Sequence, residues 1–158
     1  MVTIEQYTEK YHNDVVTLIT SIQQNEFNIP ITYEQQPDLA DIKTFYDGFW
    51  IATDNHHCIG TIGLKLIEDF GVIRKMFVHK DFRGSTFGVA QKLLTTLESE
   101  CIKRKIAIIY LGTTDFFKAA HKFYEKNGYL EIHREELPNE FPIMHVDTKF
   151  YCKKLIIS

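Results

Sequence analysis

The sequence predicts a mixed α/β fold, with a central, mostly antiparallel sheet of about seven strands flanked by about four helices. Two patterns lead to this prediction. Short strand-like runs separated by turn residues occupy the first half of the chain, and a strand–helix–strand–helix passage follows. The composition is that of an ordinary globular protein, with 44% hydrophobic and 25% charged residues. The 158 residues contain no repeat, low-complexity tract or linker, so we expect one domain spanning residues 1–158.

Four segments carry apolar residues at the spacing of a helix face. The clearest lies at 88–104, where Val89, Ala90, Leu93, Leu94, Leu97 and Cys101 fall on one stripe. The others are residues 13–24, 38–46 and 116–127. We expect Asp38 to open the second helix as its N-cap, Asp115 to cap the last, and Gly128 to follow it at the C′ position.

Seven runs have the residues typical of strands. They are residues 2–7, 49–53, 58–67, 71–79, 106–111, 129–133 and 148–156. Asp54 to His57 predicts a hairpin turn, so His56 and His57 are interpreted as turn residues and not as metal ligands. Residues 106–111 are apolar on both faces, as in a central strand covered on both sides.

Net charge, cysteine spacing and the length of the apolar runs argue against several classes of function. A net charge of -3 and the lack of a long basic run argue against a nucleic-acid partner. Cys58, Cys101 and Cys152 are scattered, which argues against a disulfide framework and a structural zinc site. No signal peptide is visible, and the longest apolar run is too short to span a bilayer. We therefore expect a soluble, cytoplasmic protein with no metal and no membrane partner.

The turn from Arg83 to Ala90 joins a strand to the start of the best helix. A glycine-bearing turn that enters a helix exposes several backbone N–H groups at the positive end of the helix dipole. Such a turn suits a phosphate or pyrophosphate. Gly84 and Gly88 permit unusual backbone angles, Arg83 adds positive charge, and Ser85 and Thr86 add hydroxyl donors. An ordinary solvent-exposed loop explains the same residues.

A second element decides between these interpretations. The segment around Arg83 to Ala90 resembles the acetyl-CoA signature of the GCN5-related N-acetyltransferase (GNAT) family. A strand is followed by Arg83-Gly84, and Gly88-Val89-Ala90 then opens an apolar helix. Ala120, followed by Phe123-Tyr124 and Gly128-Tyr129, is similar to that family's A-x-x-F/L-Y-x-x-x-G-F/Y element. The order and spacing of the two motifs make the pair specific.

The resemblance has two departures. The family's usual spacing is R-x-x-G-x-G/A, and we expect two extra residues between Arg83 and Ala90, hence a wider turn that still ends at Gly88. Which of residues 85–87 contacts phosphate stays open. Phe117 replaces an asparagine frequent in the family, so the contact of that asparagine to the coenzyme is expected to be absent or to come from elsewhere, such as Thr113 or Thr114.

The resemblance implies an acetyl-CoA-dependent N-acetyltransferase in which Tyr124 is the catalytic residue, donating a proton or hydrogen bond to the leaving thiolate. The pantetheine arm would pair with the backbone of Phe77 and Val78, with the strand splayed from residues 106–111 to make room. The implied coenzyme-binding residues are Phe77, Val78, Arg83, Gly84, Ser85, Thr86, Gly88, Val89, Ala90 and Thr113.

The acceptor and the base are less determined. Residues 25–37 and 135–147 are candidate lips of the acceptor pocket; their carboxylates would suit a cationic amine or serve only solubility. Candidate bases are Glu34, Glu68, Asp69, His79 and Asp147, with a water relay as the alternative. We expect a small-molecule or amino-acid acceptor. A peptide acceptor, a non-catalytic acyl-CoA sensor and a homodimer remain open.

Overall fold

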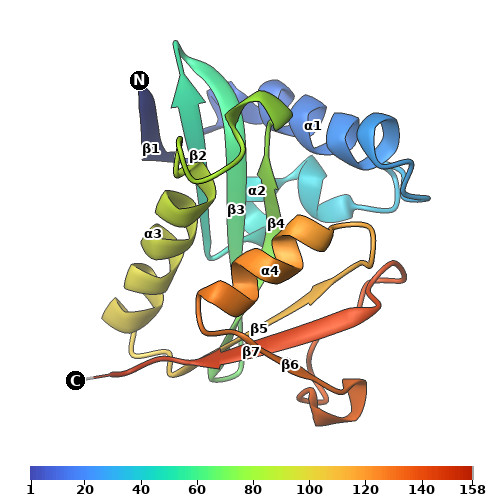
Figure 1. Cartoon of the computed structure of the whole chain (residues 1–158), viewed down its shortest axis with the longest axis vertical. Coiled ribbons are helices and arrows are strands. Elements are labelled where there is room, and N and C mark those ends of the chain that lie inside the picture. Colours follow the sequence, from blue (N-terminus) through green and yellow to red (C-terminus); the bar gives the residue numbers. More distant parts are fainter. Residues whose placement is uncertain (158) are drawn as a thin grey trace.

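Seven strands form one mixed sheet in the computed structural model, which describes residues 1–157 (Figure 1). The order across the sheet is β1-β2-β3-β4-β5-β7-β6, and only β4 and β5 run parallel to each other. The strands are β1 Val2–Gln6, β2 Gly48–Asp54, β3 His57–Ile67, β4 Phe70–Val78, β5 Ile108–Thr113, β6 Leu130–Ile132 and β7 Lys149–Lys154. The predicted mixed α/β sheet is confirmed.

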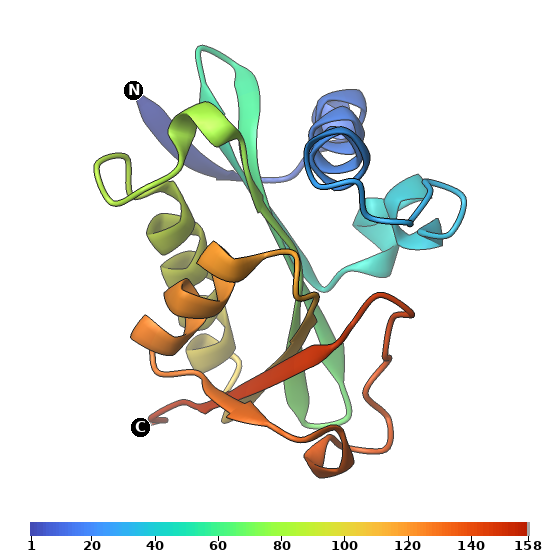
Figure 2. The same ribbon diagram turned by 45° about the vertical axis from the view of Figure 1, so that its right-hand side comes forward.

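Helices cover both faces of this sheet, with α3 and α4 on one side and α1 and α2 on the other (Figure 2). The helices are α1 His12–Thr20, α2 Ile42–Phe45, α3 Val89–Lys103 and α4 Lys118–Lys126. A π-helical turn, Ser21–Glu26, continues directly from α1. The predicted helix at 13–24 therefore exists, but its last part has wider turns.

The predicted apolar stripe of α3 packs against the sheet. Leu93, Leu94, Leu97 and Cys101 are completely buried. Burial of a leucine side chain contributes about 1.5–3 kcal/mol, so this stripe fixes α3 firmly. The N-terminus of α3 is thereby held at a defined place beside β4.

Strands β4 and β5 separate after a short contact. They pair at only two positions within the described chain, Gly71 with Ile109 and Val72 with Tyr110. Beyond these pairs β4 continues to Val78 and β5 to Thr113, and the two halves of the sheet take different directions (Figure 2). The splay implied by the family resemblance is confirmed.

Two predicted N-caps are wrong. Asp38 lies in a 3₁₀ turn, Pro37–Ala40, where its buried carboxylate accepts a hydrogen bond from the Tyr46 hydroxyl at 2.5 Å. The side chain of Asp41 caps α2 instead, accepting from the Thr44 amide.

The cap of α4 lies two residues later than predicted, at Phe117, whose side chain cannot cap. A turn closed by a hydrogen bond from the Phe117 amide to the Thr114 carbonyl delays the start of the helix, so Asp115 precedes it. The other end is as predicted. Gly128 has φ of 89°, and the Tyr129 amide donates to the Tyr124 carbonyl, which is the bond of a Schellman motif.

Candidate active site

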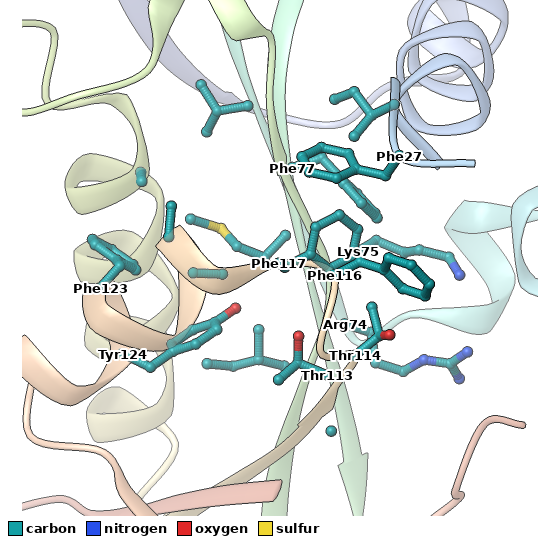
Figure 3. Close-up of a pocket in the computed structure, with 18 of the residues that line it drawn as sticks. Phe27, Arg74, Lys75, Phe77, Thr113, Thr114, Phe116, Phe117, Phe123 and Tyr124 are labelled. Carbon is teal, nitrogen blue, oxygen red and sulfur yellow. The ribbon is translucent and has the colours of Figure 1, made fainter. Parts of the chain in front are cut away.

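A pocket of about 760 Å³ lies where β4 and β5 separate (Figure 3). The two strands, the turn before α3 and α4 contribute to its lining, and so do the π-helical turn and residues 141–147. The two motifs of the sequence therefore line one shared cavity, and both predicted lips of the acceptor pocket contribute to it.

The turn before α3 presents backbone donors to this pocket. Gly84 and Gly88 both have positive φ, at 101° and 63°, and Gly88 is the last residue before the helix. The amides of Val89, Ala90 and Gln91, in the first turn of α3, have no acceptor within residues 1–157. Free amides at the positive end of a 15-residue helix have the geometry and charge that suit a phosphate.

The turn has the usual length of the family motif, so the expected two-residue expansion is wrong. Counted from Arg83, Gly88 occupies the final position of R-x-x-G-x-G/A, and Thr86 stands in place of the first glycine. Thr86 is tolerated there because positive φ occurs at Gly84 and Gly88 and not at Thr86. As expected, Gly88 and Val89 begin the helix.

Arg83 does not point freely into solvent. Its guanidinium donates to both carboxylate oxygens of Glu26, at 2.5 and 2.7 Å, and its Nε donates to the Val78 carbonyl. The hydrogen bond from Arg83 lowers the pKa of the Glu26 carboxyl. Arg83, the first residue of the predicted phosphate turn (residues 83–90), is thus joined to the end of the π-helical turn, in the segment 25–37 predicted as one lip of the acceptor pocket.

Tyr124 is only 4% exposed, yet its hydroxyl has no hydrogen-bond partner within residues 1–157. Two other buried tyrosines of the same core do have one: Tyr129 donates to Glu98 and Tyr151 to Glu125. The hydroxyl of Tyr124 points into the pocket, on the side of Thr113 (Figure 3). Burial raises its pKa, so the phenol stays protonated and can act as a donor.

Three aromatic rings pack together in the lining of the pocket. The ring of Phe117 packs edge-on against Phe27, with centroids 4.9 Å apart, and against Phe77 at 5.8 Å. Phe117 thereby joins the acceptor lip to β4 (Figure 3). The residue that departs from the family pattern has a packing role in this chain.

Most of the predicted site residues line this pocket. They are Phe77, Val78, Arg83, Gly84, Ser85, Gly88, Ala90, Thr113 and Tyr124. Thr86 lies outside the lining, and the side chain of Val89 is buried in the core, so only its backbone amide is available. Of the three turn residues left open, Ser85 is the one that faces the pocket.

Among the candidate bases, Asp147 lines the pocket. Burial raises the pKa of its carboxyl, and its Oδ2 accepts from the Met144 amide at 2.9 Å. Glu34, Glu68 and Asp69 are exposed and outside the lining, and the Nδ1 of His79 accepts from the Asp81 amide. His56 lies in the β2–β3 turn with positive φ, and within residues 1–157 no three His, Cys, Asp or Glu side chains gather as a metal site.

Sequence reasoning missed four charged residues of the pocket, two on β4 and two, Lys118 and Lys126, on α4. Arg74 and Lys75 lie within β4, where an apolar strand pattern predicts core residues. The signal was two adjacent cations inside that pattern. Sequence reasoning also missed Glu26, because nothing in a loop glutamate indicates its partner 57 residues away.

The family that matches this chain is described as the acetyltransferase (GNAT) family, and it matches residues 14–129. The chain belongs to the GNAT family. The expectation of an acetyl-CoA-dependent N-acetyltransferase is thereby confirmed at the level of the family. No helix in residues 1–157 has the length and apolar character needed to cross a membrane.

Two solved structures and one curated protein illustrate what this chain is similar to. A GNAT-family acetyltransferase from Staphylococcus aureus Mu50 is 40% identical, with a TM-score of 0.94 over 99% of this chain and 100% of that one. The PaiA N-acetyltransferase of Thermoplasma acidophilum, solved with coenzyme A, is 15% identical with a TM-score of 0.77 over 98% and 99%, and shows the shared fold. N-acetylaspartate synthetase of Danio rerio is 30% identical over 63% of this chain, a match that covers 37% of that protein.

Proposed function

We propose that this protein transfers an acetyl group from acetyl-CoA to a primary amine of a small molecule or amino acid, by direct attack of the neutral amine on the thioester. One observation carries the proposal. The unpaired Tyr124 hydroxyl points into the same cavity as the phosphate turn.

The residues present fit the coenzyme. The free amides at the start of α3 and the hydroxyl of Ser85 suit the pyrophosphate, and Lys118 and Lys126 on α4 add positive charge along the same end of the pocket. The edge of β4 beyond Val72 is unpaired with β5, which leaves main-chain groups for the amides of the pantetheine arm.

Acetyl-CoA supplies an activated thioester, and the chain's own groups orient the reaction. The Tyr124 phenol donates to the sulfur as it leaves, since burial keeps the hydroxyl protonated. The backbone of Phe77 and Val78 orients the carbonyl. Asp147, alone or through water, accepts the proton of the amine.

The test is the release of free thiol from acetyl-CoA in the presence of amino acids, simple amines, polyamines and short peptides. Turnover with at least one small amine, reduced in Tyr124→Phe, is expected. Binding of acetyl-CoA without turnover on any acceptor would favour the sensor alternative. Turnover on peptides alone would favour a protein acetyltransferase.

A further inference from the structure

Positively charged residues outnumber negatively charged ones in the lining of the pocket. Among residues 1–157, Asp147 is the one carboxylate in the lining, against the cations Arg74, Lys75, Arg83, Lys118 and Lys126. The last three lie on the phosphate turn and on α4, where the phosphates of a coenzyme would account for them. Arg74 and Lys75 lie on β4, toward the acceptor end, and have no such explanation.

A bulge in β4 brings these two side chains together. Neighbouring residues of a regular strand point to opposite faces. Lys75 has φ of 55°, and the register of β4 against β3 shifts here, because Thr61 pairs with Phe77 whereas Gly63 pairs with Arg74. The Lys75 carbonyl accepts from the Thr61 hydroxyl at 2.7 Å, which holds the bulge. Both side chains therefore extend to the same side (Figure 3).

Both cations are buried but incompletely paired. Their side chains are 11% and 6% exposed, and Asp38 is the carboxylate between them, 3.9 Å from Arg74 Nη2 and 3.6 Å from Lys75 Nζ. Lys75 also donates to Gln36 at 2.7 Å. A buried charge is costly unless its donors find acceptors.

Arg74 is the less satisfied of the two. Its Nη2 contacts the sulfur of Met144 at 3.1 Å, and its guanidinium lies over the Phe45 ring. No oxygen within residues 1–157 accepts a hydrogen bond from this guanidinium. A planar fork of donors without an oxygen acceptor, facing a pocket, matches a carboxylate.

We propose that Arg74 and Lys75 bind the carboxylate of the acceptor, so that the substrate is a free amino acid or another small amine that carries a carboxylate. The inference rests on the proposed transferase function. Tyr124 approaches the pocket from α4, and the two cations extend to the side away from it (Figure 3). A carboxylate held by Arg74 leaves the amine of the same molecule free to face the thioester, between the cations and Tyr124.

This geometry disfavours the cationic amines that the acidic lips first suggested. The carboxylates of residues 135–140 are exposed and do not line the pocket. A polyamine would bring further positive charge beside Arg74 and Lys75 and would be repelled. The walls supplied by Phe27, Ile29 and Ile31 offer contacts only to apolar parts of the acceptor.

The experiment compares each amino acid of a panel with its amide and with the amine that lacks the carboxyl group. For the best amino acid, kcat/KM is expected to exceed that of both analogues ~10-fold or more, as for a hydrogen bond to a charged group. The amide is a fair competitor, because its α-amine is less basic and more of it is neutral. Equal rates for the three compounds would overturn the inference while leaving the transferase function intact.

Arg74→Gln and Lys75→Gln test the residues. Each substitution should bring the ratio of kcat/KM for the amino acid to kcat/KM for its amide toward one, with the KM for acetyl-CoA unchanged. Lys118→Gln should instead raise the KM for acetyl-CoA and leave that ratio unchanged. Arg74→Lys, which keeps the charge but loses the fork, should lie between. Equilibrium unfolding of each variant identifies those that simply fail to fold.

Calorimetry with each amino acid of the panel in the presence of coenzyme A separates the two proposals, because it needs no turnover. Binding to the wild type that weakens ~10-fold or more in Arg74→Gln supports the carboxylate site even if no amine is turned over, in which case the transferase proposal alone fails. Binding that is unchanged in both glutamine variants overturns the carboxylate site.

Discussion

Arg83 and Glu26 form a two-pronged ion pair, with N···O distances of 2.5 and 2.7 Å, between the phosphate turn and the acceptor side of the pocket. Phe27, the residue after Glu26, lies under the same guanidinium. Phosphate oxygens would compete with Glu26 for these donors. On the proposed function, coenzyme binding and the position of the acceptor lip would therefore be linked through Arg83.

Glu26→Gln should lower the KM for acetyl-CoA by ~2- to 5-fold, because a partly exposed ion pair contributes up to about 1 kcal/mol and the substitution removes this competition. Arg83→Gln should raise the same KM. Acetyl-pantetheine, which has no pyrophosphate, is the control substrate: its KM should respond to neither change. An unaltered KM for acetyl-CoA in both variants would show that Arg83 serves the lip alone.

Tyr124→Phe should lower kcat by ~10²-fold, the usual contribution of a positioned proton donor. The dissociation constant for acetyl-CoA should be unchanged. The free energy of unfolding should also change little, because the hydroxyl has no protein partner within residues 1–157. Activity without this loss would exclude Tyr124 as the donor.

Tyr129→Phe is the matched control for that experiment. Tyr129 lies in the same core and donates to Glu98 at 2.7 Å. Its loss should cost about 1–3 kcal/mol of unfolding free energy, because the carboxylate loses a buried donor, and should leave kcat nearly unchanged. The two variants together separate chemistry from packing at buried tyrosines.

Much of this fold follows from local pattern, whereas the acceptor end of the site does not. The stripe of α3 and the glycine after α4 predict their elements because periodicity and positive φ are local properties. The unpaired hydroxyl of Tyr124 and the ion pair of Arg83 depend on residues distant in sequence. The role of Arg74 could not be predicted for another reason. A bulge changes the face of the strand that a residue occupies, and the residues around Arg74 do not indicate that a bulge is present.

Gly88→Ala should destabilise the protein by about 1–2 kcal/mol, the cost of a left-handed conformation for a residue with a Cβ. Space is not the obstacle, since a Cβ at this position would meet nothing closer than the Ser85 carbonyl at 4.0 Å. Gly88→Asn is the matched variant and should cost less, because asparagine tolerates this conformation. Thermal unfolding measures the difference. If both variants lose the same amount of stability, the left-handed backbone conformation of Gly88 is not the cause of the loss.

Burial lowers the pKa of Lys75 to about 8, against the opposing attraction of Asp38; Arg74 lowers this pKa further and Asp147 raises it. Between pH 8 and about 10.5 the unfolded chain binds a proton at this lysine that the folded chain does not. The lysine therefore reduces stability below pH 8, and the free energy of unfolding should rise with pH across that window relative to Lys75→Met.

The same proton governs binding if Lys75 holds the carboxylate of the acceptor. Below pH 8 the Lys75 ammonium attracts the carboxylate, and above pH 8 that attraction is lost. The N-acetylated product of the best amino acid is the suitable probe, because it has a carboxylate and no amine that titrates. In the wild type, the inhibition constant of this product against the acceptor should increase up to ~10-fold from pH 7 to pH 9.5, the change that one unit of pKa coupling allows. In Lys75→Met the inhibition should be weaker, and the inhibition constant should not change with pH. A flat profile in the wild type would assign the carboxylate to Arg74 alone.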